Sequence, residues 1–410
     1  MSCWRICCTE SESRRNQDGT KLCRRGVRAY RRHCPAAEKG AGMPLDGEKS
    51  MSAKQRRACI RTAWRHKRRG GADMEKEFAA GRRRFLCLLW GGVGVCAAIT
   101  VLSLCLGNIV FTPRELFDIL VGGSAGMGRS ILLYARLPRT FGALLAGAAL
   151  AVSGAVLQSI LANKLASPGI IGVNAGAGLG VTVCCAFGVI SGPRVSLAAF
   201  GGSLATVLVI FFFSRRTGAS KTTVILGGVA LNSILNAICE SITVLDTEVA
   251  MLSIDFRVGG FSSVSYLRLA PAAGIILLAL AALLTLCNEL DVAGLGDDTA
   301  RGVGLSVGKY RMIFLALAAL LAGAAVSFAG LLGFVGLIVP HFVRRLSGSE
   351  SGRLLPLCAI FGAGFVTLCD TASRLIFAPY ELPVGILMSV IGGPVFLYLL
   401  MRHKGGHRRD

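Results

Sequence analysis

The chain has 410 residues, of which 53% are hydrophobic, and it carries a formal net charge of +22 at pH 7. Residues 1–84 hold 23 of the 45 Lys and Arg residues but only 9 of the 23 Asp and Glu residues, so +14 of the net charge lies there. A basic chain raises the question of nucleic-acid binding. This basic arm has only a few scattered aromatic residues, without a repeated basic–aromatic pattern, and no recognisable binding fold, which argues against a nucleic-acid partner.

We expect residues 1–84 to lie outside the functional domain, either as a disordered cytosolic arm or as sequence upstream of the natural start. Met74 looks like a more natural beginning than Met1 or Met51. The six cysteines of the arm lack the paired spacing of a zinc site. The other nine lie mostly inside apolar stretches, where cysteine is expected as a small packing residue. The chain is therefore expected to hold no metal and no cofactor.

Nine long stretches almost without charge follow the arm, and they decide the fold class. A membrane-crossing helix needs roughly 20 mostly apolar residues, and peptide groups in lipid must be hydrogen-bonded within the segment, which favours helices. The sequence therefore predicts an all-α, polytopic membrane protein. The stretches cover residues 85–113, 140–163, 165–193, 195–214, 222–239, 269–288, 312–343, 354–369 and 382–401.

The stretch 312–343 is too long for one crossing, because 32 helical residues would extend about 48 Å. Gly330, Gly333 and Gly336 interrupt it. We therefore divide it into 312–330 and 331–343, which gives ten spans and puts both termini on one side. With that side inside, the inner segments from Arg82 onward hold 17 Lys and Arg residues and the outer ones hold eight. This asymmetry agrees with the positive-inside rule.

Four motifs in the apolar region point to one family. They are Arg-Leu-Pro-Arg at 136–139, Asn-Lys-Leu-Ala-Ser-Pro-Gly at 163–169, Gly-Phe-Val-Gly-Leu-Ile-Val-Pro-His at 333–341 and Asp-Thr-Ala-Ser-Arg at 370–374. In this order, over residues 85–404, the sequence resembles the FecCD-type permeases. These are the membrane subunits of type II ATP-binding-cassette (ABC) importers for iron–siderophore, haem and cobalamin. Lys164 and Ser167 depart from the family pattern, which usually has proline and an acidic residue there.

A polar loop at 289–311, after the sixth span, contains Asp298-x-Ala300-x-x-x-Gly304. This spacing resembles the coupling motif of importer permeases, which forms two short helices that dock on the ATPase. A carboxylate favours the positive end of a helix, the small residue permits close approach, and glycine allows the turn. The resemblance implies ATPase-coupling roles for Leu295, Gly296, Asp298, Ala300, Arg301 and Gly304.

The resemblance also implies two further sets of site residues. Arg136, Arg139 and Arg374 match the arginines that meet carboxylates of an extracytoplasmic substrate-binding protein, although arginines at a membrane interface can also simply reach toward water. For the translocation pathway we select Asn232 and Asn236, which lie one helical turn apart on the fifth span, and more weakly Gln158 and Asn163. Hydrogen bonding between helices is the alternative role of these amides.

No phosphate-binding loop occurs, because Lys221 lacks the preceding glycine of that motif. The chain is thus expected to be no enzyme, with Mg-ATP bound by a separate ATPase subunit. Further expected partners are the binding protein, membrane lipid and a second permease copy or paralogue. We expect the cytoplasmic (inner) membrane of a bacterium or archaeon, with both termini and the tail 405–410 in the cytoplasm. The cargo would be a bulky metal chelate moved by alternating access, with iron–siderophore ranked before haem and cobalamin.

Two other classes stay open at this point. A secondary transporter driven by an ion gradient would need buried carboxylates and broken helices at mid-membrane, and the apolar stretches offer almost none. A structural membrane scaffold would have no need of the coupling loop.

Overall fold

The computed structural model describes residues 81–107, 109–122, 126–190, 192–217, 221–376, 378 and 380–404. The chain divides into two units, Met1–Phe78 and Ala79–Asp410, and the first lies outside the described residues. So do most of the expected basic arm and the tail 405–410. Residues 81–84 are helical, so the arginines at 82–84 belong to the first helix.

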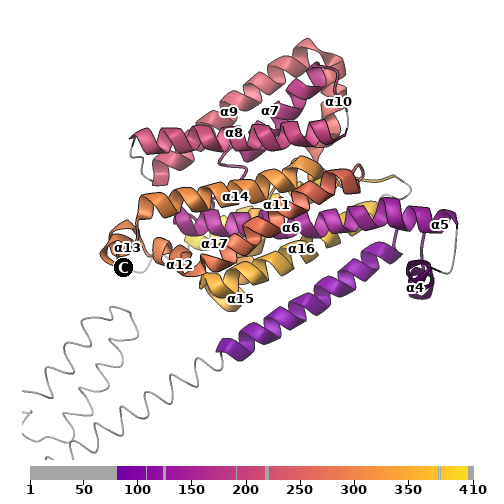
Figure 1. Ribbon diagram of the computed structural model, residues 1–410, viewed down its shortest axis with the longest axis horizontal. Coiled ribbons are helices and arrows are strands. Elements are labelled where there is room, and N and C mark those ends of the chain that lie inside the picture. Colours follow the sequence, from indigo (N-terminus) through magenta and orange to yellow (C-terminus); the bar gives the residue numbers. More distant parts are fainter. Residues whose placement is uncertain are drawn as a thin grey trace, which may run out of the picture. The chain divides into compact units, whose positions relative to one another are not determined.

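Within the described residues the fold is built from helices and turns, as Figure 1 shows. The first helix, Gly81–Cys105, is followed by the short helices α4 (Pro113–Val121) and α5 (Met127–Ser130) and by a π-helical turn, η2 (Ile131–Arg136). The remaining helices are α6 (Leu137–Ile160), α7 (Val173–Ala186), α8 (Pro193–Thr217), α9 (Lys221–Leu245), α10 (Thr247–Val258), α11 (Tyr266–Thr285), α12 (Cys287–Gly294), α13 (Asp297–Gly302), α14 (Val307–Ala329), α15 (Val335–Ser347), α16 (Ser351–Ile376) and α17 (Val384–Lys404).

Each of the ten predicted spans corresponds to one of these helices. Seven are long and apolar enough to cross a membrane, Val173–Ala186 and Val384–Tyr398 are shorter apolar helices, and α15 is the tenth. The predicted division of 312–343 is confirmed, because α14 ends at Ala329 and α15 begins at Val335. The stretch 165–193 forms one helix, α7, after a non-helical approach.

Helix α6 lies at the centre of the larger helix group, where it packs mainly against α14, α15 and α16. Two pairs of glycines allow the backbone of α6 to come close to those of its neighbours. A Cβ on Gly147 would overlap the carbonyl of Gly362 in α16, and a Cβ on Gly154 would overlap that of Gly336 in α15. In lipid the hydrophobic effect does not bring helices together, so close van der Waals packing at small residues stabilises their contact instead. Close contact at these glycines therefore brings the backbone of α6 against those of α15 and α16.

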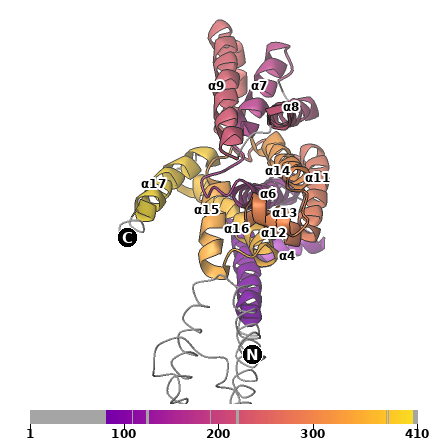
Figure 2. The same cartoon turned by 90° about the vertical axis from the view of Figure 1, so that its left-hand side faces the viewer.

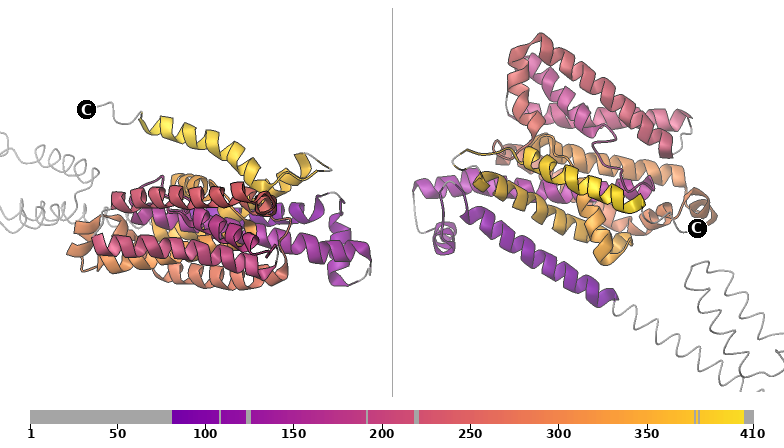
Figure 3. Two further views of the ribbon diagram at one scale, coloured as in Figure 1. Left: turned by 90° about the horizontal axis from the view of Figure 1, so that it is seen from above. Right: turned by 180° about the vertical axis from the view of Figure 1, so that it is seen from behind.

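Helices α7, α8, α9 and α10 form a second group, which meets the first mainly where α8 packs on α14. Figure 2 shows α7, α8 and α9 together on one side of α6 and α14. In this group Thr182 of α7 and Cys239 of α9 share a hydrogen bond of 3.0 Å. Helix α17 lies at the edge of the larger group (Figure 3). The first helix packs along α16 near Gly92 and Gly364.

Candidate functional site

The segment from α12 through α13 to the start of α14 is the candidate coupling site. The structure confirms two short helices between α11 and α14, at the opposite end of the helix group from α4 and α5 (Figure 1). Helix α14 begins at Val307, so the last residues of the expected loop 289–311 form its first turn. Asp297 and Asp298 occupy the first turn of α13, where the helix dipole favours negative charge.

Helix α13 ends in a Schellman turn that explains the predicted motif. The amide of Leu305 donates to the carbonyl of Ala300 at 3.0 Å, and the amide of Gly304 donates to that of Arg301 at 2.9 Å. Gly304 has φ +91, yet a Cβ there would meet no atom within 4 Å. Glycine is therefore needed at this position for its backbone conformation, and not for lack of space. Ala300 is completely buried, as close helix approach requires.

The outer surface of this segment exposes two large apolar side chains. Leu295 is 67% exposed and Val303 is 71% exposed, and they flank α13 in the chain. Asp298 and Arg301 are also exposed. Arg311 of α14 forms an ion pair with Asp297, with 2.6 Å between the guanidinium nitrogen and the carboxylate oxygen. This ion pair was not predicted from the sequence. The segment thus presents a mixed apolar and charged surface. Its backbone is fixed by the turn at Gly304 and by the ion pair of Asp297. A surface of this composition is typical of a protein-binding site.

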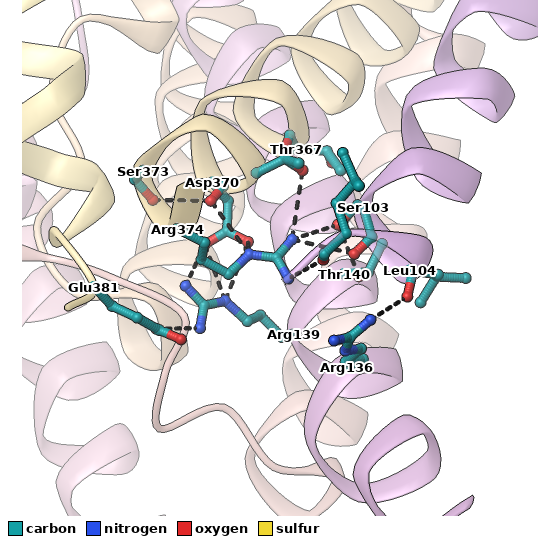
Figure 4. Close-up of polar contacts among 12 residues, drawn as sticks. Ser103, Leu104, Arg136, Arg139, Thr140, Thr367, Asp370, Ser373, Arg374 and Glu381 are labelled. Atoms are coloured by element: carbon teal, nitrogen blue, oxygen red, sulfur yellow. Dashed lines mark hydrogen bonds and ion pairs between the residues drawn. The ribbon is translucent and has the colours of Figure 1, made fainter. Parts of the chain in front are cut away.

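At the other end of α6 lies a cluster of paired charges (Figure 4). Arg139 donates from Nε to both carboxylate oxygens of Asp370 at 3.1 Å and from Nη2 at 3.0 Å, and its Nη1 lies 2.6 Å from Glu381. Arg374 lies 3.3 Å from Asp370 and donates to the Ser103 hydroxyl at 2.8 Å. The Asp370 side chain is completely buried between the two guanidinium groups.

Two of the predicted docking arginines hold the end of the first helix. Arg136 donates to the carbonyls of Leu104 at 2.6 Å and of Cys105 at 3.2 Å, and its guanidinium lies 4.6 Å from the Phe111 ring centroid. Arg374 donates to the carbonyl of Ser103 at 3.3 Å. Carbonyls at a helix C-terminus lack partners within the helix and carry partial negative charge. In this structure Arg136, Arg139 and Arg374 all have partners in the chain, and their docking role stays a prediction.

The four predicted pathway residues lie in different surroundings. Gln158 is buried, its Nε2 donates to the Gly336 carbonyl at 2.9 Å, and its Oε1 accepts from Arg344. Asn163 accepts from the amide of Leu165 at 2.9 Å and shapes the turn after α6. Asn232 is half-buried and Asn236 is exposed, both on α9. The structure therefore does not bring the four together, and of the four side chains Asn236 alone is exposed.

The sequence profile of the FecCD transport family matches residues 95–402. The chain belongs to the FecCD transport family. A relative in Bacillus subtilis (strain 168), the uncharacterised ABC transporter permease protein YvrB, is 37% identical over 77% of this chain and 94% of its own length.

Two further comparisons agree with this assignment. The vitamin B12 import system permease protein BtuC of Escherichia coli O127:H6 is 34% identical over 74% of this chain and 91% of its own length. A solved structure, described as the inward-facing conformation of a transporter assigned to the metal-chelate ABC type, has a TM-score of 0.70 and 28% identity. It is matched over 98% of its length and 77% of this chain.

Family membership decides between the open classes. As an FecCD family member, this chain is an ABC permease, a multi-span transport subunit whose ATP hydrolysis is supplied by a separate subunit. The alternatives of an ion-gradient transporter and of a structural scaffold are thereby set aside.

Proposed function

We propose that this chain is the membrane permease of an ABC importer that moves a bulky metal chelate by alternating access. The observation that carries the proposal is the α12–α13 segment, a short exposed helix with the family's Asp-x-Ala-x-x-x-Gly spacing and a Schellman turn. The ATPase would contact Leu295, Asp298, Arg301 and Val303. Nucleotide binding then shifts the permease between two states, because it favours the arrangement in which the ATPases close.

Helix α9 is the proposed lining of the pathway. Ser233, Asn236 and Glu240 are exposed and follow one another at three- and four-residue intervals, which places them on one face of α9. A polar face is costly toward lipid, so it favours an aqueous cavity or a second permease copy as its neighbour. We propose a dimer, formed by two copies of this chain or by this chain and a paralogue, with a pathway between the two α9 helices.

The orientation follows from charge. The α12–α13 end of the helix group includes Lys309, Arg311, Arg344, Arg345 and Arg353 near the ends of their helices. Cytoplasmic loops carry an excess of such residues. The proposal therefore puts this end in the cytoplasm of a bacterium or archaeon and the α4–α5 end, with Arg136, Arg139 and Arg374, toward an extracytoplasmic binding protein.

The test is transport by the reconstituted complex. The chain, its ATPase and its binding protein are placed in vesicles, and uptake of cobalamin, an iron–siderophore and haem is measured in parallel with and without ATP. Asp298→Leu and Gly304→Val should abolish ATP-dependent uptake, whereas Gly274→Ala, at an open position on α11, should not. Uptake that persists without ATP, or normal uptake by both coupling variants, would refute the proposal. The chelate taken up identifies the cargo.

A further inference from the structure

Helix α12 is attached to the beginning of α16 by one carboxylate. Asp291 of α12 accepts hydrogen bonds from the Ser351 backbone amide, at 2.8 Å to Oδ1 and 3.2 Å to Oδ2, and from the Ser351 hydroxyl at 2.6 Å. Ser351 is the first residue of α16 and is 1% exposed. The two residues are 60 positions apart in the sequence, so this contact joins two distant segments of the chain.

The hydrogen bonds between Asp291 and Ser351 are strong and directional. The first amides of a helix have no partner within it, and the helix dipole adds partial positive charge at that end. A carboxylate that accepts such amides forms charge-assisted hydrogen bonds. The buried side chains of α12 are the apolar or weakly polar residues Cys287, Leu290 and Ala293. Apolar surfaces can slide past one another, whereas the Asp291 contact ties the position of α12 to the end of α16.

Helix α16 connects this contact to the charge cluster at the other end of the helix group. It runs without interruption from Ser351 to Ile376, and Ser351 and Asp370 are separated by about 28 Å of helix. Asp370 and Arg374 then hold Arg139 of α6 and Ser103 of the first helix. A displacement of α12 would therefore act on α16 at one end and on α6 and the first helix at the other.

We propose that Asp291 is a positioning residue for energy coupling, which transmits movement of the α12–α13 segment to α16. The inference rests on the proposed function, because it takes this segment to be the one that the ATPase moves. Asp291 need not touch the ATPase or the cargo. Loss of its charge should separate ATP hydrolysis from transport while the fold and the complex persist.

The experiment measures cargo moved per ATP hydrolysed in vesicles that contain the full complex. Asp291→Ala should lower this ratio on the order of tenfold, the factor by which loss of one charged hydrogen bond shifts an equilibrium. Asp291→Asn should lower it less, and Asp291→Glu should restore part of it. Ser351→Ala should add little to Asp291→Ala, because Asp291→Ala already removes the acceptor of the Ser351 hydroxyl. The matched control is Glu350→Gln, which removes a neighbouring, exposed carboxylate paired with Arg353 at 3.1 Å, and it should leave the ratio unchanged.

The outcomes separate the two proposals. If Asp298→Leu and Gly304→Val leave transport coupled, the proposed function fails. If those variants uncouple transport and Asp291→Ala does not, only the role of Asp291 is refuted. If Asp291→Ala does not assemble, Asp291→Asn decides, because it keeps the side-chain shape and loses the charge. A normal ratio in that variant overturns the proposal, as does an equal fall in Glu350→Gln.

Discussion

Helices α6 and α9 have similar apolar sequences but opposite places in the fold. Both are apolar enough to cross a membrane, yet the most apolar 18-residue part of Met127–Ile160, which contains α6, is 83% buried, whereas that of Thr222–Leu245, in α9, is 17% buried. Hydropathy reports whether a helix can enter a bilayer and does not report how central it is. What distinguishes α6 is close backbone contact at Gly147 and Gly154 and polar side chains that are bonded inside the protein.

The largest difference in stability is expected between Asp370, which pairs with Arg139 of α6, and Glu240 of α9. Asp370→Asn removes the charge that lies between Arg139 and Arg374, and breaking a buried ion pair in this way costs about 3–5 kcal/mol. Glu240→Gln, on the exposed face of α9, should leave the unfolding midpoint unchanged. Denaturant unfolding of both purified variants in one detergent measures the difference. Equal losses would show that Asp370 contributes no more than a surface charge.

A smaller difference is expected for glycine. Gly154→Ala places a methyl group on the Gly336 carbonyl, and overpacking of this kind costs about 1–3 kcal/mol. Gly227→Ala on α9 would meet Phe213 at 3.6 Å, an ordinary contact, and should be neutral. The thermal unfolding midpoints of the two variants make the comparison. A midpoint for Gly154→Ala at the wild-type value would mean that α6 and α15 can separate without loss.

The side-chain amides of Gln158 on α6 and Asn236 on α9 should affect different properties of the protein. Gln158→Leu leaves the Gly336 carbonyl and Arg344 without the partner seen here, which should lower the free energy of unfolding by about 1–3 kcal/mol. Asn236→Leu should leave stability unchanged and reduce uptake, because the side chain is exposed on the proposed pathway face. Unfolding and vesicle uptake are measured for both. Normal uptake by Asn236→Leu would remove α9 from the pathway.

The smallest effect is expected at Cys287, where α12 packs on α6 and α14. Burial raises the pKa of this thiol above its ordinary value, and the carboxylates of Asp291 and Glu289 raise it further. Because thiolate is the reactive form, alkylation should be slow at pH 8 and should keep accelerating above pH 9. Asp291→Asn should lower the thiol pKa and speed the reaction by less than about tenfold. Peptide-resolved mass spectrometry measures the rates, and an unchanged rate would place the two groups farther apart.

The sequence by itself determined the ten apolar helices and the turn of the predicted coupling motif, but not the short helices α4, α5 and α10. Ten apolar segments, the break near Gly330 and the turn at Gly304 could all be predicted, because local apolarity and backbone conformation are properties of short segments. Only the tertiary structure decided that α6 is central, that Arg139 pairs with Asp370 and that Asp291 binds the start of α16. Lipid is as apolar as a leucine side chain, so no hydrophobic signal separates inner from outer helices. Contacts between residues 60 and 231 positions apart depend on packing that no local pattern records.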